Sequence, residues 1–315
     1  MTDETTDPPG ERLAELGNGI TLAYDTFGDE SDAPVLLIQG LGMQMIGWPE
    51  EFCEQLAAEG FYVVRFDNRD VGHSTHLEAV PAPGLRQLAT RRFGPDQYSL
   101  DEMADDAALL LDELDIAPAH VVGVSLGGMI AQTLAARHPD KLRTLTSMLS
   151  TTGHRLKGQP ALGMLRLLLK QAPKEREAFV EHVTTVFETI GSRGLTRDTD
   201  EVRDLAARSY DRGTDPAGSG RQLGAILRSG NRTAAVRRIS VPTLVIHGTE
   251  DKLVRPSGGK ATAKAIADAR LELIDGMGHD LPRAVWPQLV EGIAAHARRA
   301  DEAAGREHAG RAAQA

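Results

Sequence analysis

The clearest chemical signal in the sequence is a serine flanked by two glycines. Residues 123–127 read Gly-Val-Ser-Leu-Gly, which matches the pattern Gly-X-Ser-X-Gly. An apolar run at 120–124 predicts a buried strand directly before Ser125, and 126–137 has the spacing of a helix. A serine at such a strand-to-helix turn has an exposed hydroxyl that can act as a nucleophile. A tight turn with an incidental serine is the alternative, and the surrounding strand and helix disfavour it.

Candidates for a base and an orienting acid follow the serine in the chain. A serine hydroxyl needs a base to take its proton, and the base needs an acidic partner. Glu250 and Asp251 follow the apolar run 241–246 after a glycine turn, and we favour Asp251 as the acid. His279 follows the last predicted strand in the loop 276–279, which reads Gly-Met-Gly-His, and is the candidate base. The chain order of serine, acid and histidine fits this type of turn.

The other histidines give no sign of a metal or cofactor site. We expect His247 to be a partly buried strand residue near the site and His73 to be structural. Three more resemble solvated helix or tail residues: His138, His296 and His308. No zinc-type spacing is present, and no glycine-rich phosphate loop follows the first strand, so we expect neither a metal nor another cofactor.

A second glycine-containing segment could stabilise negative charge. Residues 39–42 read Gln-Gly-Leu-Gly and follow the apolar run 34–38. When Ser125 attacks a carbonyl, charge develops on the oxygen, and two backbone N–H groups can bind it. We expect the N–H groups of Leu41 and Leu126 to form this oxyanion hole. A plain strand-to-helix turn is the alternative interpretation of the loop.

Short apolar runs alternate with helical patterns along most of the chain and would position these residues. Strands are predicted at 20–27, 34–38, 62–66, 120–124, 142–149, 241–246 and 271–274. Helices are predicted at 48–58, 100–114 and 126–137, and again after each of the last two strands. Several strands are continuously apolar, which is typical of a parallel sheet covered on both faces. Functional residues gather at the carboxyl ends of the strands in such sheets.

The alternation breaks in one long stretch, where only helices are predicted, at 161–171, 174–189, 200–210 and 222–229. Because this stretch lies between two sheet strands, we expect 151–238 to be an inserted helical cap. The α/β core would then comprise 11–150 and 239–298. Residues 1–10 have the composition of a disordered tail. Residues 299–315 would form either a tail or an extension of the last helix.

The composition is that of an ordinary globular protein and disfavours several kinds of partner. Hydrophobic residues make up 41% of the chain, charged residues 25%, and the formal net charge is −10 at pH 7. An acidic chain without a basic stripe is a poor partner for nucleic acids. No apolar run approaches the roughly 18 residues of a membrane span. The first residues lack the pattern of a secretory signal, and the single cysteine, Cys53, cannot form an internal disulfide, so we expect a cytoplasmic location.

As a set, these motifs resemble the α/β-hydrolase superfamily. The resemblance is carried by the loop at 39–42, the segment 67–74, the serine turn, Gly248 with Asp251, and Gly278 with His279. It covers about residues 11–298. It implies an α/β-hydrolase fold, with a mostly parallel central sheet, helices on both faces and an inserted helical cap. It also implies an acyl-enzyme on the serine, because the epoxide hydrolases and haloalkane dehalogenases of this superfamily use an aspartate nucleophile.

More narrowly, the chain is similar to the aclacinomycin methylesterase group of bacterial esterases. The similar stretches are Gly-Trp-Pro at 47–49, the segment 67–75 with Asp70 in place of the commoner glycine, and Gly-Met-Gly-His-Asp-Leu-Pro at 276–282. Gln39 is a departure, because a histidine often precedes the loop glycine. The resemblance does not extend to the substrate, since specificity resides in the cap, where the sequence contains no motif.

These residues and the resemblance predict a serine esterase that cleaves carboxylic esters of a small to medium apolar substrate. A lactonase, thioesterase, C–C hydrolase or perhydrolase would use the same three residues, and a non-catalytic binding protein is an alternative of another class. We expect a small-molecule ester to be the partner; the oligomeric state is left open. Six residues could line an apolar pocket, with ordinary core packing as the alternative for each methionine: Gly40, Gly42, Met43, Met129, Met148 and Met164.

Overall fold

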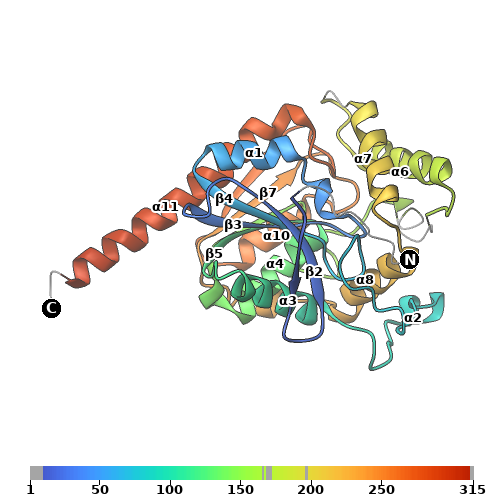
Figure 1. Ribbon diagram of the computed structural model, residues 1–315, viewed down its shortest axis with the longest axis horizontal. Helices are drawn as coiled ribbons and strands as arrows, with labels where there is room; N and C mark the ends of the chain where they lie inside the picture. Colours follow the sequence, from blue (N-terminus) through green and yellow to red (C-terminus); the bar gives the residue numbers. More distant parts are fainter. Residues whose placement is uncertain (1–9, 165–166, 168–171, 196–197, 313–315) are drawn as a thin grey trace, which may run out of the picture.

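A computed structural model describes residues 10–164, 167, 172–195 and 198–312 (Figure 1). Within this part of the chain, eight strands form one sheet in the order β1-β2-β4-β3-β5-β6-β7-β8. The strands are β1 (Arg12–Glu15), β2 (Thr21–Phe27), β3 (Ala33–Ile38), β4 (Phe61–Phe66), β5 (Ala119–Val124), β6 (Leu142–Met148), β7 (Thr243–Gly248) and β8 (Arg270–Ile274). β2 pairs antiparallel with β1 and β4, whereas all neighbours from β4 to β8 pair parallel. The predicted mostly parallel sheet is confirmed.

Helices cover both faces of this sheet. Those outside the inserted segment are α1 (Glu50–Ala58), α2 (Leu85–Thr90), α3 (Leu100–Glu113), α4 (Leu126–Arg137), α10 (Ser257–Ala265) and α11 (Trp286–Ala312), with short 3₁₀ turns η1 (Met45–Gly47), η2 (Pro139–Lys141) and η3 (Arg283–Val285). Leu36 of β3 packs in one apolar cluster with α3 and α4, and the adjacent Leu37 packs in another with α1 and α11. Successive side chains of a strand point to opposite faces, so the central strands had to be continuously apolar.

Outside the inserted segment, one strand and one helix were not predicted from the sequence, and both carry a weak apolar signal. β1 has four residues and buries one of them, Ala14, at the edge of the sheet. α2 buries none of its residues. A pattern of alternating or 3.6-residue hydrophobicity arises only where an element has a face to bury.

The segment 151–238, which we call the inserted segment, lies between β6 and β7. Its described helices are α6 (Arg176–Ile190), α7 (Thr199–Asp211), α8 (Pro216–Ser229) and α9 (Thr233–Val236), and α6 and α7 pack side by side (Figure 1). Most of the helix predicted at 161–171 lies outside the described residues, as do residues 1–9 of the predicted N-terminal tail. No described helix of the protein combines the length and the apolar character needed to cross a membrane.

Two buried ion pairs join the inserted segment to the loop after β4. Arg212 donates to Asp67, at 2.9 Å between Nη2 and Oδ2. Arg221 of α8 donates to both carboxylate oxygens of Asp70, at 2.7 and 2.9 Å. Both aspartates are fully buried. Each carboxylate therefore depends on an arginine of the inserted segment for its counter-charge.

The C-terminal helix extends far beyond the sheet, and one of its residues differs from expectation. α11 continues to Ala312, so residues 299–312 extend the last helix. His296 was expected to be solvated, but it is 5% exposed and its Nε2 lies 3.3 Å from the carbonyl oxygen of Pro242. Its neighbours Ile293 and Ala297 pack in the apolar cluster beneath α11, which buries the imidazole with them. Burial lowers the pKa of His296 from 6.5 to about 4.

This burial should make the stability of the protein depend on pH. The unfolded chain binds a proton at His296 more readily than the folded chain does. The contribution of the neutral, buried imidazole to stability is therefore complete above pH 6.5 and is lost as the pH falls toward 4. Between pH 7 and 4.5 we expect this site to cost about 2–3 kcal/mol of unfolding free energy. Urea denaturation of the wild type and of His296→Gln at both pH values measures it. Equal losses in the two proteins would contradict the assignment.

Candidate active site

Ser125 lies at the turn between β5 and α4 with an unusual backbone conformation. Its φ is 57° and its ψ is −116°, a combination that costs a non-glycine residue of order 1–3 kcal/mol. A Cβ on Gly123 would lie 2.2 Å from the carbonyl oxygen of Gly127, and one on Gly127 would lie 2.0 Å from that of Ile38. Only glycine fits at these two positions, because strand and helix approach each other here without room for a side chain.

The structure brings the three predicted catalytic residues into one hydrogen-bonded series. Ser125 Oγ lies 2.9 Å from His279 Nε2, and His279 Nδ1 lies 2.7 Å from Asp251 Oδ2. The other carboxylate oxygen of Asp251 accepts the N–H groups of Leu253 and Val254, at 2.9 and 2.8 Å. These contacts suit a serine nucleophile, a histidine base and an acid that orients the imidazole.

The electrostatics of the site keep the acid ionised. Burial alone raises the pKa of Asp251, but the charge of His279 and hydrogen bonds from His247 and His279 outweigh this effect and lower the pKa to about 2. His247 is fully buried beside Asp251, where the sequence had suggested partial burial. A carboxylate that stays ionised can stabilise the imidazolium formed when the histidine takes a proton.

The loop after β3 lies directly against the nucleophile. A Cβ on Gly40 would be 3.4 Å from Ser125 Cβ. The N–H of Gly40 donates to its neighbour Gln39, and that of Gly42 donates to Gln222 of α8. Within the described chain, no protein acceptor takes the N–H of Leu41 or of Leu126, the first residue of α4. These two groups thus remain available as donors beside Ser125.

A cavity of about 1190 Å³ opens onto Ser125 and His279. Its apolar lining comes from the loop after β3, from α6 and α7, and from the segment around η3, with members such as Leu41, Phe187 and Trp286. Charged residues of α1, α7 and η3 also line it: Glu50, Glu51, Asp200, Glu201, Asp204, Arg208 and Arg283. The inserted segment therefore supplies part of the wall that a substrate would meet.

The cavity includes only part of the predicted pocket. Gly40 and Met43 line the cavity. Four predicted residues are absent from its lining, and the prediction is corrected for them: Gly42, Met129, Met148 and Met164. Met129 and Met148 pack instead in the apolar clusters on opposite faces of the sheet, which is the alternative of core packing. Gly42 instead faces Ser219 of α8.

The histidine loop is held by contacts that the sequence did not reveal. The N–H of His279 donates to the carbonyl of Ile190, the last residue of α6, at 2.9 Å. Ser192 accepts the N–H of Gly278 and donates to Asp280, with distances of 2.8 and 2.6 Å. Asp280 could have been suspected from its place beside the histidine, whereas nothing in the sequence around Ser192 indicates this role.

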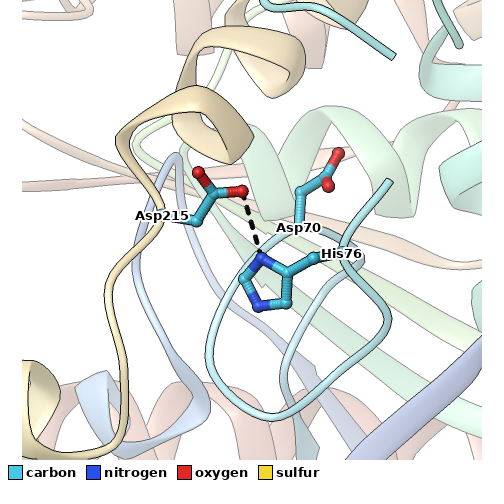
Figure 2. Close-up of side chains that lie close together, drawn as sticks. All are labelled: Asp70, His76 and Asp215. Atoms are coloured by element: carbon cyan, nitrogen blue, oxygen red, sulfur yellow. Dashed lines mark hydrogen bonds and ion pairs between the residues drawn. The ribbon is translucent and has the colours of Figure 1, made fainter. Parts of the chain in front are cut away.

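One cluster has the residue types of a metal site. Ligand atoms of Asp70, His76 and Asp215 lie within 4.8 Å of one another, and Figure 2 shows the imidazole of His76 directed at Asp215. However, Arg221 Nη2 donates to Asp70 Oδ1 and to Asp215 Oδ2, each at 2.7 Å. The guanidinium already supplies the positive charge that a cation would bring. We therefore assign the cluster to the junction between α8 and the core.

The close approach at the serine turn yields a stability prediction. Gly127→Ala places its Cβ against the carbonyl of Ile38, so we expect a loss of about 1–3 kcal/mol or more in unfolding free energy. Gly17→Ala is the matched control, because a Cβ there meets nothing within 4 Å. Thermal denaturation of both variants measures the difference. Similar midpoints for the two would show that the turn relaxes without cost.

The chain matches known proteins over most of its length. Residues 33–282 match the model of the α/β hydrolase fold family. The chain is 33% identical to a rhodomycin D methylesterase of Streptomyces sp. strain C5 over 302 residues, which are 89% of this chain and 96% of the relative. It is 32% identical, with the same coverage, to the rhodomycin D methylesterase of Streptomyces peucetius. The resemblance to bacterial methylesterases is thereby confirmed.

Solved structures agree on the fold. The enol-lactonase of Burkholderia xenovorans superposes with a TM-score of 0.71 at 22% identity, covering 90% of this chain and 99% of the other. A thermophilic esterase of Thermogutta terrifontis superposes with a TM-score of 0.69 at 21% identity, covering 92% and 98%. The chain belongs to the α/β hydrolase fold family, in the group that includes the rhodomycin D methylesterases.

Proposed function

We propose that the chain is a serine esterase that hydrolyses methyl esters of a bulky, mainly apolar carboxylic acid. The observation that carries this proposal is the unbroken series from Asp251 through His279 to Ser125 at a large cavity. The alcohol part of the substrate is taken from the relatives, which are named methylesterases. The bulk and apolar character of the acid part are inferred from the size and lining of the cavity.

In the first half of the reaction, Ser125 Oγ attacks the ester carbonyl while His279 Nε2 takes its proton. Asp251 holds the imidazole by Nδ1 and stabilises its charged form. The N–H groups of Leu41 and Leu126 bind the oxyanion, an interaction that typically contributes about 10²–10³ in rate per donor. The tetrahedral intermediate then collapses, and methanol leaves with the proton from His279.

In the second half, water hydrolyses the acyl-enzyme. His279 takes a proton from the water as its oxygen attacks the acyl carbonyl, and a second oxyanion forms in the same position. When this intermediate collapses, the Ser125–acyl bond breaks and the serine recovers its proton from His279. The acid is released, and no cofactor is consumed.

The size of the cavity favours a larger acid than the sequence suggested. Its volume of about 1190 Å³ exceeds the roughly 300–1,000 Å³ usual for small-molecule sites. α6 and α7 contribute apolar lining residues such as Ile190 and Leu205. We propose that 151–238 forms the cap and selects the substrate. A cytoplasmic location is proposed on the sequence features given above, among them the single cysteine, Cys53.

The serine is tested by turnover. We expect release of p-nitrophenol from an acyl series, and of methanol from methyl esters of bulky aromatic acids, to fall at least about 10⁴-fold in Ser125→Ala. Ser31→Ala is the control and should behave as the wild type, because Ser31 is exposed and does not line the cavity. Hydrolysis that survives in Ser125→Ala, or a wild type inactive on every ester, would exclude this esterase. Lactones and thioesters in the same panel measure preference for the bond.

The role of Asp251 is tested by comparing it with the neighbouring carboxylate, Glu250. Asp251→Asn should lower kcat by roughly 10⁴-fold, because the amide favours the wrong histidine tautomer. Glu250→Gln is the control, since Glu250 is exposed and the carboxylate bonded to His279 is that of Asp251. With a pKa of about 2, Asp251 should remain ionised in wild-type assays down to pH 4. A greater loss in Glu250→Gln would reverse the assignment.

A further inference from the structure

We infer that His247 is a positioning residue, which fixes the carboxylate of Asp251 and through it the tilt of the His279 imidazole. The inference rests on the proposed function and deepens it. His247 lies near the end of β7, four residues before Asp251, and is fully buried. Its side chain is absent from the cavity lining, so it acts on the reaction without touching the substrate.

The Nε2 atom of His247 faces two oxygen acceptors. It lies 2.7 Å from the carbonyl oxygen of Val254 and 3.4 Å from Asp251 Oδ2. A carbonyl and an ionised carboxylate have no proton to give, so the ring must carry its own proton on Nε2. His247 is therefore a donor directed at the turn 251–254.

This donor closes a ring of contacts around that turn. Val254 donates its N–H to Asp251 Oδ1, and its carbonyl oxygen accepts from His247 Nε2, so this residue is held from both sides. The N–H of Leu253 adds a second donor to Oδ1. Oδ2 lies between His279 and His247. With both oxygens held, the plane of the carboxylate is fixed, and the imidazole bound to it is fixed as well.

The opposite side of the His247 ring has no polar function. Its Nδ1 is buried and, within the described chain, has no hydrogen-bond partner. Gly259 of α10 lies against it, and a Cβ there would be 2.6 Å from Nδ1. An apolar side chain would fill this space without an unpaired nitrogen. What the imidazole adds is therefore the proton that it presents to the turn.

The test compares side chains of equal length. In His247→Gln the amide nitrogen can take the place of Nε2, whereas His247→Met fills a similar volume without a donor. We expect His247→Met to lower kcat roughly 10- to 100-fold with little change in KM, because the imidazole of His279 is no longer fixed in the orientation that faces Ser125 Oγ. His247→Gln should recover most of this loss. His247→Asn, whose shorter amide cannot reach Val254, serves as a second variant without the donor should the methionine variant fail to fold.

A pH profile separates positioning from a general loss of structure. Without the His247 proton, Asp251 Oδ2 attracts the charged imidazole of His279 more strongly, so the acid side of the kcat/KM profile should move to higher pH in His247→Met and stay in place in His247→Gln. The concentration of reactive Ser125 is measured by titration with a fluorophosphonate, and each rate is divided by this concentration. Ser125-dependent turnover that is equal in all variants, or a loss without a shifted profile, would overturn this inference alone. A wild type without Ser125-dependent turnover would overturn the proposed function and this inference together.

Discussion

The site depends on one close approach, where the start of α4 passes the end of β3 with no space for a side chain. Gly127 lies against the carbonyl of Ile38, and Ser125, two residues earlier in the same turn, has a positive φ of 57°. The same contact brings the loop that begins at Gly40 beside the serine. The proposed nucleophile and the proposed oxyanion donors thus lie on either side of the same backbone contact. The central strands beside this contact are apolar on both faces because helices cover both of them.

The fold, and the proximity of Ser125, His279 and Asp251, could be predicted from the sequence because each has a local signal. The strand, the glycines and the helix around Ser125 adjoin one another in the chain, and His279 lies in its own glycine loop. The pocket could not be predicted in the same way. Met129 and Met148 lie near strand ends, yet their side chains point into the two cores. Which face a residue presents there depends on packing between distant segments, and the sequence carries no periodic mark of it.

Contacts between the inserted segment and the core were equally hidden. Ser192 binds the histidine loop from 86 residues away, at Gly278. Its polar atoms have no spacing that would reveal the pairing. Asp67 was recognisable as part of a motif, but its arginine partner lies 145 residues later, in a segment without motifs. Long-range polar pairs of this kind come from topology, and only the folded chain discloses them.

The two arginines that reach back to the core also bear on how such enzymes diversify. Arg212 and Arg221 neutralise Asp67 and Asp70, so exchanging the inserted segment for that of a relative would strand two buried negative charges unless the arginines came with it. The inserted segment then has two parts: the two arginines, which must be retained, and the residues that line the cavity, which can vary. Chimeras that exchange this segment can change the cavity lining, provided that both arginines are transferred with it.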